Sequence, residues 1–359
     1  MQNRTPLTRN LGAAWLYFYV HYVTEVICFF ALTKLTGDSP WLWIAPFAYD
    51  ALAFVPQGII GRISDRFPKI QMTTAGVLLM CLAGLDFWLG FLPGRFTALV
   101  ILCLGNACTH INGAEVTLRC SDGKLSHPAI FVAGGSFGVI TGKLLAKTFV
   151  PYWAVVLFTL TAIPFALLAE YYRKDADKLD NPCEKYDYNN PKVSPGIVVL
   201  VATLIVIVRG YMGYGIPTSW NKTTLQTVFL FVTMGLGKGL GGVIADLIGV
   251  KKTAILSMIC ALPFLFFGDN RMFVSLIGVM FFSMTMSITL ALIVSVLQKA
   301  PGVAFGFTTI GLFLGTAPIF FFKFTTTLAN CIVIAALTAL CLAGVCLIAR
   351  KDGKRNEQL

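Results

Sequence analysis

His21 and Glu25 lie four residues apart within a long apolar stretch near the start of the chain. On a helix this spacing puts both side chains on one face, and Tyr17 continues that face by one more turn. An imidazole beside a carboxylate can share a proton with it and pass the proton on. The spacing therefore predicts proton coupling through Glu25 and His21, with Asp50 in the next apolar stretch as a third candidate.

Other ionisable groups also lie inside apolar stretches, where a charge is costly unless it is paired or hydrated. Arg209 falls near the middle of one such stretch. Its guanidinium is always charged and can hold a carboxylate or a phosphate through two parallel hydrogen bonds. An ion pair with Glu25 or Asp50 is the alternative role for Arg209. Four charged residues have either structural or functional roles: Asp50, Asp86, Lys143 and Lys238. A structural ion pair with Lys143 is the alternative role for Asp50.

The segment from Gly105 to Glu115 is unusually polar for an apolar stretch. Asn106, His110 and Gly113 fall on one helical face within it. Amide and imidazole groups in such a place either bind a polar solute or hydrogen-bond neighbouring helices. We predict that the solute is bound by Arg209, His110, Asn106 and Tyr17.

The sequence lacks recognisable motifs for metal binding, nucleotide binding or enzymatic catalysis. The ten cysteines lie mostly inside apolar stretches and lack the spacing of metal ligands. The sequence has no phosphate-binding loop and no recognisable set of nucleophile and base. We therefore expect neither an enzyme nor a metal site, and no cofactor.

Composition indicates which elements must position these groups. Hydrophobic residues make up 57% of the 359 positions and charged residues only 13%, which is more apolar surface than one soluble core can hide. Apolar runs of about twenty residues recur, each long enough to cross a hydrocarbon layer of ~30 Å as a helix. Because these runs do not alternate as barrel strands do, we predict an all-α integral membrane protein with twelve transmembrane helices. The expected spans are 11–34, 41–61, 70–92, 96–118, 128–149, 151–171, 196–216, 223–245, 252–269, 272–297, 302–323 and 326–349.

The net charge of +11 is explained by the placement of the basic residues. Most of them fall in connections on one side of the predicted membrane, which is the positive-inside pattern. We predict a multi-pass protein of the cell (cytoplasmic) membrane with both termini in the cytoplasm. Nucleic acid is not expected as a partner.

A short segment between the second and third expected spans has a partial copy half a chain later. The segment runs from Gly61 to Lys69, and Gly242 to Lys252 repeats its Gly-x-x-x-Asp core and its trailing basic residues. Such a repeat predicts two similar six-helix bundles related in parallel, which rock against each other. We expect an N-terminal bundle over 1–172, a cytoplasmic linker over 173–195 and a C-terminal bundle over 196–359.

The first copy resembles the loop between helices 2 and 3 of the major facilitator superfamily, although Pro68 stands where the family usually has glycine. The matching residues are Gly61, Arg62, Ser64, Asp65, Arg66 and Phe67. Twelve spans and a central linker extend the resemblance over essentially the whole chain. It implies that Asp65 docks on the start of the eleventh span, near Pro301 and Gly302, and helps to latch the outward-facing state. A solvated basic turn is the alternative interpretation.

The resemblance also implies where the other candidates lie. In the family, helices 1, 4, 7 and 10 line a central cavity, which would place His21, Glu25, His110 and Arg209 around it. Glu115 and Arg119 lie one turn apart at the cytoplasmic end of the fourth expected span, where we expect them to belong to the latch around Asp65. The predicted gating residues are Gly61, Asp65, Arg66, Arg119, Glu115, Gly242 and Asp246. Small-residue ridges are expected to allow close contact between the halves at Gly134, Gly138, Gly142, Gly302, Gly306, Gly311 and Gly315.

These features predict a secondary active transporter that moves a small organic solute, anionic or zwitterionic, by alternating access. Its expected partners are the solute, protons and the lipid bilayer, and it is expected to act as a monomer. A proton-coupled exporter of cationic or amphipathic compounds is the nearest alternative. A non-transporting membrane receptor or a lipid scramblase on the same fold is the alternative from a different class.

Overall fold

The computed structural model describes residues 6–37, 44–174, 183–321 and 326–350. Over these ranges the regular structure is helical, with one isolated β-bridge between Asn189 and Ala349. The helices are α1 (Pro6–Gly37), α2 (Ile44–Phe54), α3 (Gln57–Arg66), α4 (Met72–Leu89), α5 (Arg95–Arg119), α6 (Ser126–Leu145), α7 (Tyr152–Leu160), α8 (Ala162–Lys174), α9 (Pro195–Gly215), α10 (Thr224–Ile248), α11 (Val250–Phe267), α12 (Met272–Ser283), α13 (Met286–Val296), α14 (Pro301–Thr316), the 3-10 helix η2 (Ala317–Phe320) and α15 (Thr327–Ile348).

Twelve helical segments are long and apolar enough to cross a membrane, and they coincide with the twelve expected spans to within a few residues. Some of these segments contain two consecutive helices. Pro56 separates α2 from α3, and Pro164 and Pro318 lie just after the start of α8 and η2. Proline interrupts a helix because it lacks the backbone N–H and its ring clashes with the preceding turn. The prediction of an all-α protein with twelve transmembrane helices is confirmed.

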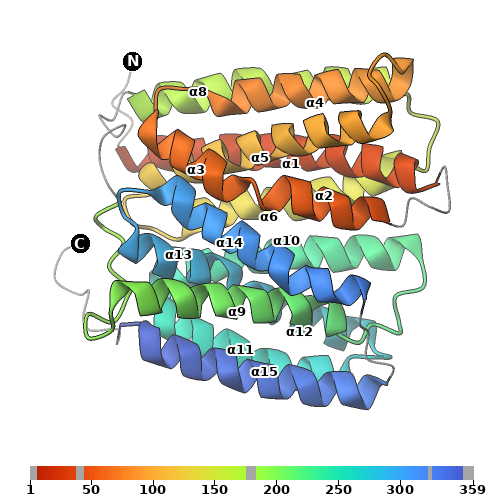
Figure 1. The fold of residues 1–359 in the computed structure, drawn as a ribbon. Helices are drawn as coiled ribbons and strands as arrows, with labels where there is room; N and C mark the ends of the chain where they lie inside the picture. Colours follow the sequence, from red (N-terminus) through yellow and green to blue (C-terminus); the bar gives the residue numbers. More distant parts are fainter. Residues whose placement is uncertain (1–5, 38–43, 175–182, 322–325, 351–359) are drawn as a thin grey trace.

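The helices form two groups with roughly parallel axes (Figure 1). Helices α1 to α8 make up the first half of the molecule, and α9 to α15 make up the second half. Within the first half α1 packs along α6, and α4 packs along α5. Between the halves the principal contacts are those of α6 with α10 and of α3 with α14.

Residues 183–194 bridge both halves at one end of the helices, which we call the linker end. The Tyr186 side chain is fully buried, and its hydroxyl lies 2.8 Å from the Ser121 hydroxyl of the first half. From the second half, the Gln298 amide donates to the Tyr186 carbonyl at 2.9 Å. Ser295 accepts a hydrogen bond from the Tyr188 backbone at 3.2 Å. Residues 183–194 therefore pack against both halves.

The two copies of the repeated segment are more helical than predicted. The first was expected to be a loop from Gly61 onward, but α3 continues to Arg66, and the Phe67 N–H still bonds back to Ile63. The second copy continues α10 to Ile248, and Gly249 then turns the chain at a φ of 95°, a conformation that glycine adopts freely. Asp65 and Asp246 therefore lie in the last turns of helices, which fixes the direction of their carboxylates.

The predicted glycine ridges are only partly at the interface between the halves. A methyl group added at Gly134 or Gly138 would lie 2.3 Å from a backbone oxygen of α1, so α6 uses these glycines within its own half. The expectation of an inter-half contact is wrong for them. It holds for Gly302, because a methyl on Gly302 would lie 2.7 Å from the Gly61 oxygen across the interface.

Candidate functional site

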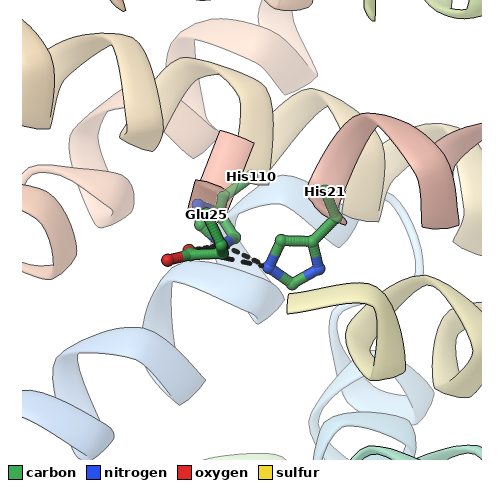
Figure 2. A group of neighbouring side chains, drawn as sticks. All are labelled: His21, Glu25 and His110. Atoms are coloured by element: carbon green, nitrogen blue, oxygen red, sulfur yellow. Dashed lines mark hydrogen bonds and ion pairs between the residues drawn. The ribbon is translucent and has the colours of Figure 1, made fainter. Parts of the chain in front are cut away.

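Three buried ionisable side chains meet in the first half, where α1 packs against α5 (Figure 2). His21 and Glu25 come from α1, and His110 comes from α5. The Nε2 atoms of the two histidines lie 2.7 Å apart. Glu25 Oε1 lies 3.2 Å from Nε2 of His110 and 3.8 Å from Nε2 of His21. We call these three residues the triad, and each of their side chains is at most 8% exposed.

Backbone carbonyls determine how the triad can be protonated. Nδ1 of His21 lies 2.8 Å from the Phe131 oxygen, and Nδ1 of His110 lies 3.0 Å from the Asn106 oxygen. Because a carbonyl oxygen only accepts hydrogen bonds, both Nδ1 atoms must carry hydrogen. Nε2 of each neutral ring is then an acceptor, and the Glu25 carboxylate adds a third. Three facing acceptors are stabilised when one proton or one metal ion lies among them.

Asn106 positions two members of the triad. Its side-chain amide donates to Glu25 Oε1 at 3.2 Å and to the Tyr49 hydroxyl at 3.0 Å, while its backbone oxygen holds His110. The Asn106 side chain is fully buried. Asn106 was predicted to contact the solute, whereas in this structure its side chain supports the Glu25 carboxylate.

Glycines of α6 let this helix close over the triad. A methyl group on Gly135 would lie 2.5 Å from Nε2 of His21, and one on Gly138 would lie 2.7 Å from Cβ of Glu25. Side chains larger than hydrogen at these positions would therefore displace the triad. Because Gly135 and Gly138 have no side chains, the backbone of α6 packs directly against His21 and Glu25.

Charged groups from both halves gather near the triad. Glu25 acts electrostatically on Asp50 of α2 and on Lys238 of α10, which belongs to the second half. Lys143 of α6 acts on Asp50 in turn. The Lys143 ammonium lies over aromatic rings from both halves, 5.0 Å from the ring centre of Phe231 in α10. The acidic side chains of Glu25 and Asp50 therefore have the cations Lys143 and Lys238 as electrostatic neighbours.

Arg209 lies elsewhere, inside the second half. Its guanidinium donates to the Phe282 carbonyl and lies 4.4 Å from the centre of the Phe282 ring. The surrounding pocket is formed by α9, α11, α12 and α15, with these lining residues: Met212, Met258, Ala261, Leu262, Leu265, Phe282, Thr338 and Cys341. The structure does not bring Arg209 together with the other three residues predicted to bind the solute.

The hydroxyl of Tyr17 bonds to residues outside the triad, although Tyr17 shares a helical face with His21 and both rings pack against Phe131. Its hydroxyl donates to Asn112 Oδ1 at 3.2 Å and lies 3.3 Å from the Thr73 hydroxyl. Tyr17 is fully buried. These contacts connect α1, α4 and α5 within the first half.

An acidic side chain at the end of α3 caps a helix of the second half, and we use the name first latch for this contact. The two carboxylate oxygens of Asp65 accept hydrogen bonds from the backbone N–H groups of Gly302 and Val303, both at 2.9 Å. These N–H groups begin α14, where the helix dipole favours a negative charge. Arg119 lies 3.7 Å from Asp65 and binds Glu115 at 2.9 Å. The contact lies where the resemblance implied, with Glu115 and Arg119 beside it, and the gating role of these residues stays a prediction.

Arg66 lies outside this set of contacts. It is exposed, and its guanidinium lies 5.6 Å from the centre of the Phe67 ring. The structure thus places Asp65, Glu115 and Arg119 together and leaves Arg66 at the surface.

The second latch has the same construction in the reverse direction. Asp246, near the end of α10, accepts hydrogen bonds from the backbone N–H groups of Leu125 at 2.7 Å and Ser126 at 3.0 Å. These groups begin α6 in the first half. A methyl on Gly242 would lie 2.4 Å from the Leu125 oxygen, so this glycine permits the close approach. Each half therefore caps one helix of the other half at the linker end.

The sequence interpretation missed two features of this arrangement. It assigned His110 to solute binding and expected no metal-type cluster, yet His21, Glu25 and His110 place three ligand atoms within 4.8 Å of one another. It also named no docking partner for Asp246. The repeat itself contained that information, because the fifth span corresponds to the eleventh when the halves are superposed.

Comparison with known proteins reveals similarity in structure only. No family model and no curated protein sequence matches the chain. It is similar to the Escherichia coli fucose:proton symporter FucP, with 12% identity, a TM-score of 0.66 and coverage of 95% of this chain and 98% of that one. It is also similar to the human organic anion transporter MFSD10, with 13% identity, a TM-score of 0.65 and coverage of 96% and 100%.

A second structure of FucP, described as a major facilitator superfamily transporter in the outward conformation, matches with a TM-score of 0.64 at 12% identity. The matched region covers 95% of this chain and 99% of the FucP chain. These similarities extend over nearly the full length of both proteins, and the solved structures are those of transporters. The chain is a multi-pass membrane protein with the fold of the major facilitator superfamily.

Proposed function

We propose that the protein is a secondary active transporter that moves a small organic solute by alternating access, with protons as the coupling ion. The fold, which it shares with transporters, supports the transporter class. The observation that carries the proposal is the triad, whose three facing acceptors can take up one proton in a buried place. The symporter among the similar structures is named for proton coupling, which agrees with this assignment.

Protonation of the triad would change the charge that faces the second half. With one proton, a positive imidazolium balances the negative Glu25, and the triad is neutral. Without the proton, the triad has a net negative charge. This charge attracts the ammonium group of Lys238, which belongs to α10 and interacts electrostatically with Glu25. A ligand shifts a conformational equilibrium only when it interacts differently with the two states. The triad provides that difference if Lys238 moves relative to Glu25 when the halves rock.

The proposed solute carries an anionic group. Lys143 and Lys238 place cations where the two halves meet, and Arg209 supplies a third cation within the second half. One of the similar structures is that of an organic anion transporter. Replacing Lys143 with Ala separates the proposed solute classes, because an anion bound where the halves meet should lose affinity in this variant and a cation should not.

The function is tested with purified protein in two stages. A thermal-shift screen against organic anions, zwitterions and cations first identifies a solute that stabilises the protein. Uptake of that solute is then measured in proteoliposomes, both under an imposed pH gradient and as counterflow without a gradient. Glu25→Gln should abolish accumulation driven by the gradient and retain counterflow, because only the coupling ion loses its site.

Glu184→Gln provides the matched control, since Glu184 is exposed in the linker. It should behave as the wild type in both assays. Unchanged gradient-driven accumulation in Glu25→Gln would exclude the triad as the coupling site. A solute that binds but shows no flux in either assay would identify the protein as a receptor.

A further inference from the structure

We propose that the triad is also a binding site for a divalent first-row transition-metal ion. Nε2 of His21, Nε2 of His110 and a carboxylate oxygen of Glu25 lie within 4.8 Å of one another (Figure 2). Two imidazole nitrogens and one carboxylate oxygen form a ligand set that suits zinc, cobalt and iron in their divalent states. This inference rests on the geometry of the triad alone and does not require the proposed transport function.

The hydrogen bonds around the triad are of the kind that orient histidine rings for metal binding. Metal-binding histidines usually donate their second ring N–H to a carbonyl or a carboxylate, which fixes the tautomer and aims the free nitrogen at the ion. Nδ1 of His21 and Nδ1 of His110 both do this, through the carbonyls of Phe131 and Asn106. The Asn106 amide holds the Glu25 carboxylate in the same way, at 3.2 Å.

The spacing of the ligand atoms requires only a small adjustment. Two nitrogens bound to one tetrahedral ion at about 2.05 Å lie roughly 3.3 Å apart. The two Nε2 atoms are 2.7 Å apart, while the Glu25 oxygen already lies 3.2 Å and 3.8 Å from them. Because His21 and His110 belong to different helices, their rings can separate by the remaining fraction of an ångström. Three protein ligands leave a fourth position open, which is the arrangement of exchangeable metal sites.

The test is metal binding to the full-length purified protein after removal of any histidine tag and treatment with a chelator. The chain then contains only three histidines, His21, His110 and His127. Cobalt(II) is titrated, bound metal is counted by mass spectrometry after dialysis, and the visible spectrum is recorded. We expect one ion per chain with nitrogen and oxygen ligation. His110→Gln or Glu25→Gln should weaken binding at least tenfold, and His127→Gln should bind as the wild type.

Gly135→Ala tests the site without removing a ligand. Its methyl group would lie 2.5 Å from Nε2 of His21 and should weaken cobalt binding in a protein that keeps all three ligand residues. Apparent melting temperatures establish that each variant is folded, and added cobalt should raise this temperature in the wild type and in His127→Gln only.

Several results would overturn the proposal. Equal cobalt binding in the wild type and in the triad variants would place the ion elsewhere, and a thiolate-to-cobalt charge-transfer band would place it at cysteines. Absence of binding to the folded wild type would leave the triad as a proton site only. Loss of proton-coupled uptake in the earlier assay has no bearing on these outcomes, because metal binding is measured without a solute or a gradient.

Discussion

Asp65 and Asp246 each hold the two halves together through one carboxylate. Each aspartate accepts two backbone N–H groups at the start of a helix from the opposite half. A charged acceptor at this position is stabilised both by the hydrogen bonds and by the helix dipole. At the residue scale, two single side chains thus contribute to the contact between the halves at the linker end, and we call the arrangement in which both contacts are made the closed form.

Replacing Asp65 by Asn should open the linker end more often. The variant loses the negative charge, so we expect the closed form to lose about 1–2 kcal/mol, which corresponds to roughly a 5- to 30-fold change in population. Cys183 reports the opening because it is buried beside Asp65 and Arg119. Burial raises the pKa of the Cys183 thiol to about 12, so maleimide labelling near neutral pH should be slow until the region opens.

The labelling rate of Cys183 is read by peptide mass spectrometry, and Asp187→Asn is the control. Asp187 pairs with Arg350 at the same end of the molecule, but both side chains are more than half exposed. An exposed pair of this kind contributes little to stability, so the control should label at the wild-type rate. An unchanged rate in Asp65→Asn would contradict the latch role of Asp65.

Asp269 should make stability depend on pH at the opposite end of the helices. Burial acts to raise the pKa of this carboxyl, but hydrogen bonds from Ser219 and Thr327 outweigh it and lower the pKa below its usual value. A lowered pKa contributes stability above the unfolded value of about 3.9, and this stability is lost as pH falls through the folded value. Asp269→Asn should therefore lower the apparent melting temperature at pH ~7, and this loss should become smaller as pH falls below about 3.9.

The comparison of neutral with acidic pH is the control for Asp269, because a general packing defect would persist in acid. Equal destabilisation at neutral and acidic pH would contradict the role of its charge. The measurement requires a detergent that is stable across this pH range, such as a neutral maltoside.

At the scale of elements, α10 packs against the first half at two glycines that leave different amounts of space for a side chain. A methyl group on Gly242 would lie 2.4 Å from the Leu125 oxygen, whereas one on Gly239 would meet only the Ala133 side chain at 3.7 Å. Gly242→Ala should therefore push α10 away from α6 and destabilise the closed form by about 1–3 kcal/mol. Gly239→Ala, three residues earlier on the same helix, should be neutral or stabilising by up to about 1 kcal/mol, since alanine favours a helix.

Apparent melting temperature and the Cys183 labelling rate distinguish these two glycine variants. Gly242→Ala should melt at a lower temperature and label faster, and Gly239→Ala should do neither. Similar behaviour of the two variants would show that the close approach at Gly242 does not determine the spacing of α6 and α10.

For the whole molecule, we expect the two latches related by the repeat to stabilise the same closed form. They connect different helix pairs, α3 with α14 and α10 with α6, so their free energies should add. If each single variant increases Cys183 labelling about tenfold, the double variant Asp65→Asn/Asp246→Asn should increase it about a hundredfold. The labelling assay described above measures this directly. A double variant that labels no faster than either single variant would mean that the two latches do not hold the same closed form.

The local pattern of the sequence predicted the features that depend on neighbouring residues. Length and hydropathy determined the twelve spans, because each span must satisfy its own backbone hydrogen bonds within the membrane. The helical period determined that His21 and Glu25 share a face. The repeated segment, through its resemblance to a known family, led to the contact between Asp65 and the start of α14.

The tertiary structure decided how the helices are rotated and which faces meet. It brought His110 into contact with His21, turned Arg209 into the interior of the second half and gave Asp246 its partner on α6. Helices of this kind are apolar around most of their circumference, so the hydrophobic pattern contains little information about their rotation. Contacts between distant residues then depend on close packing at small residues, which is set only when all helices are assembled.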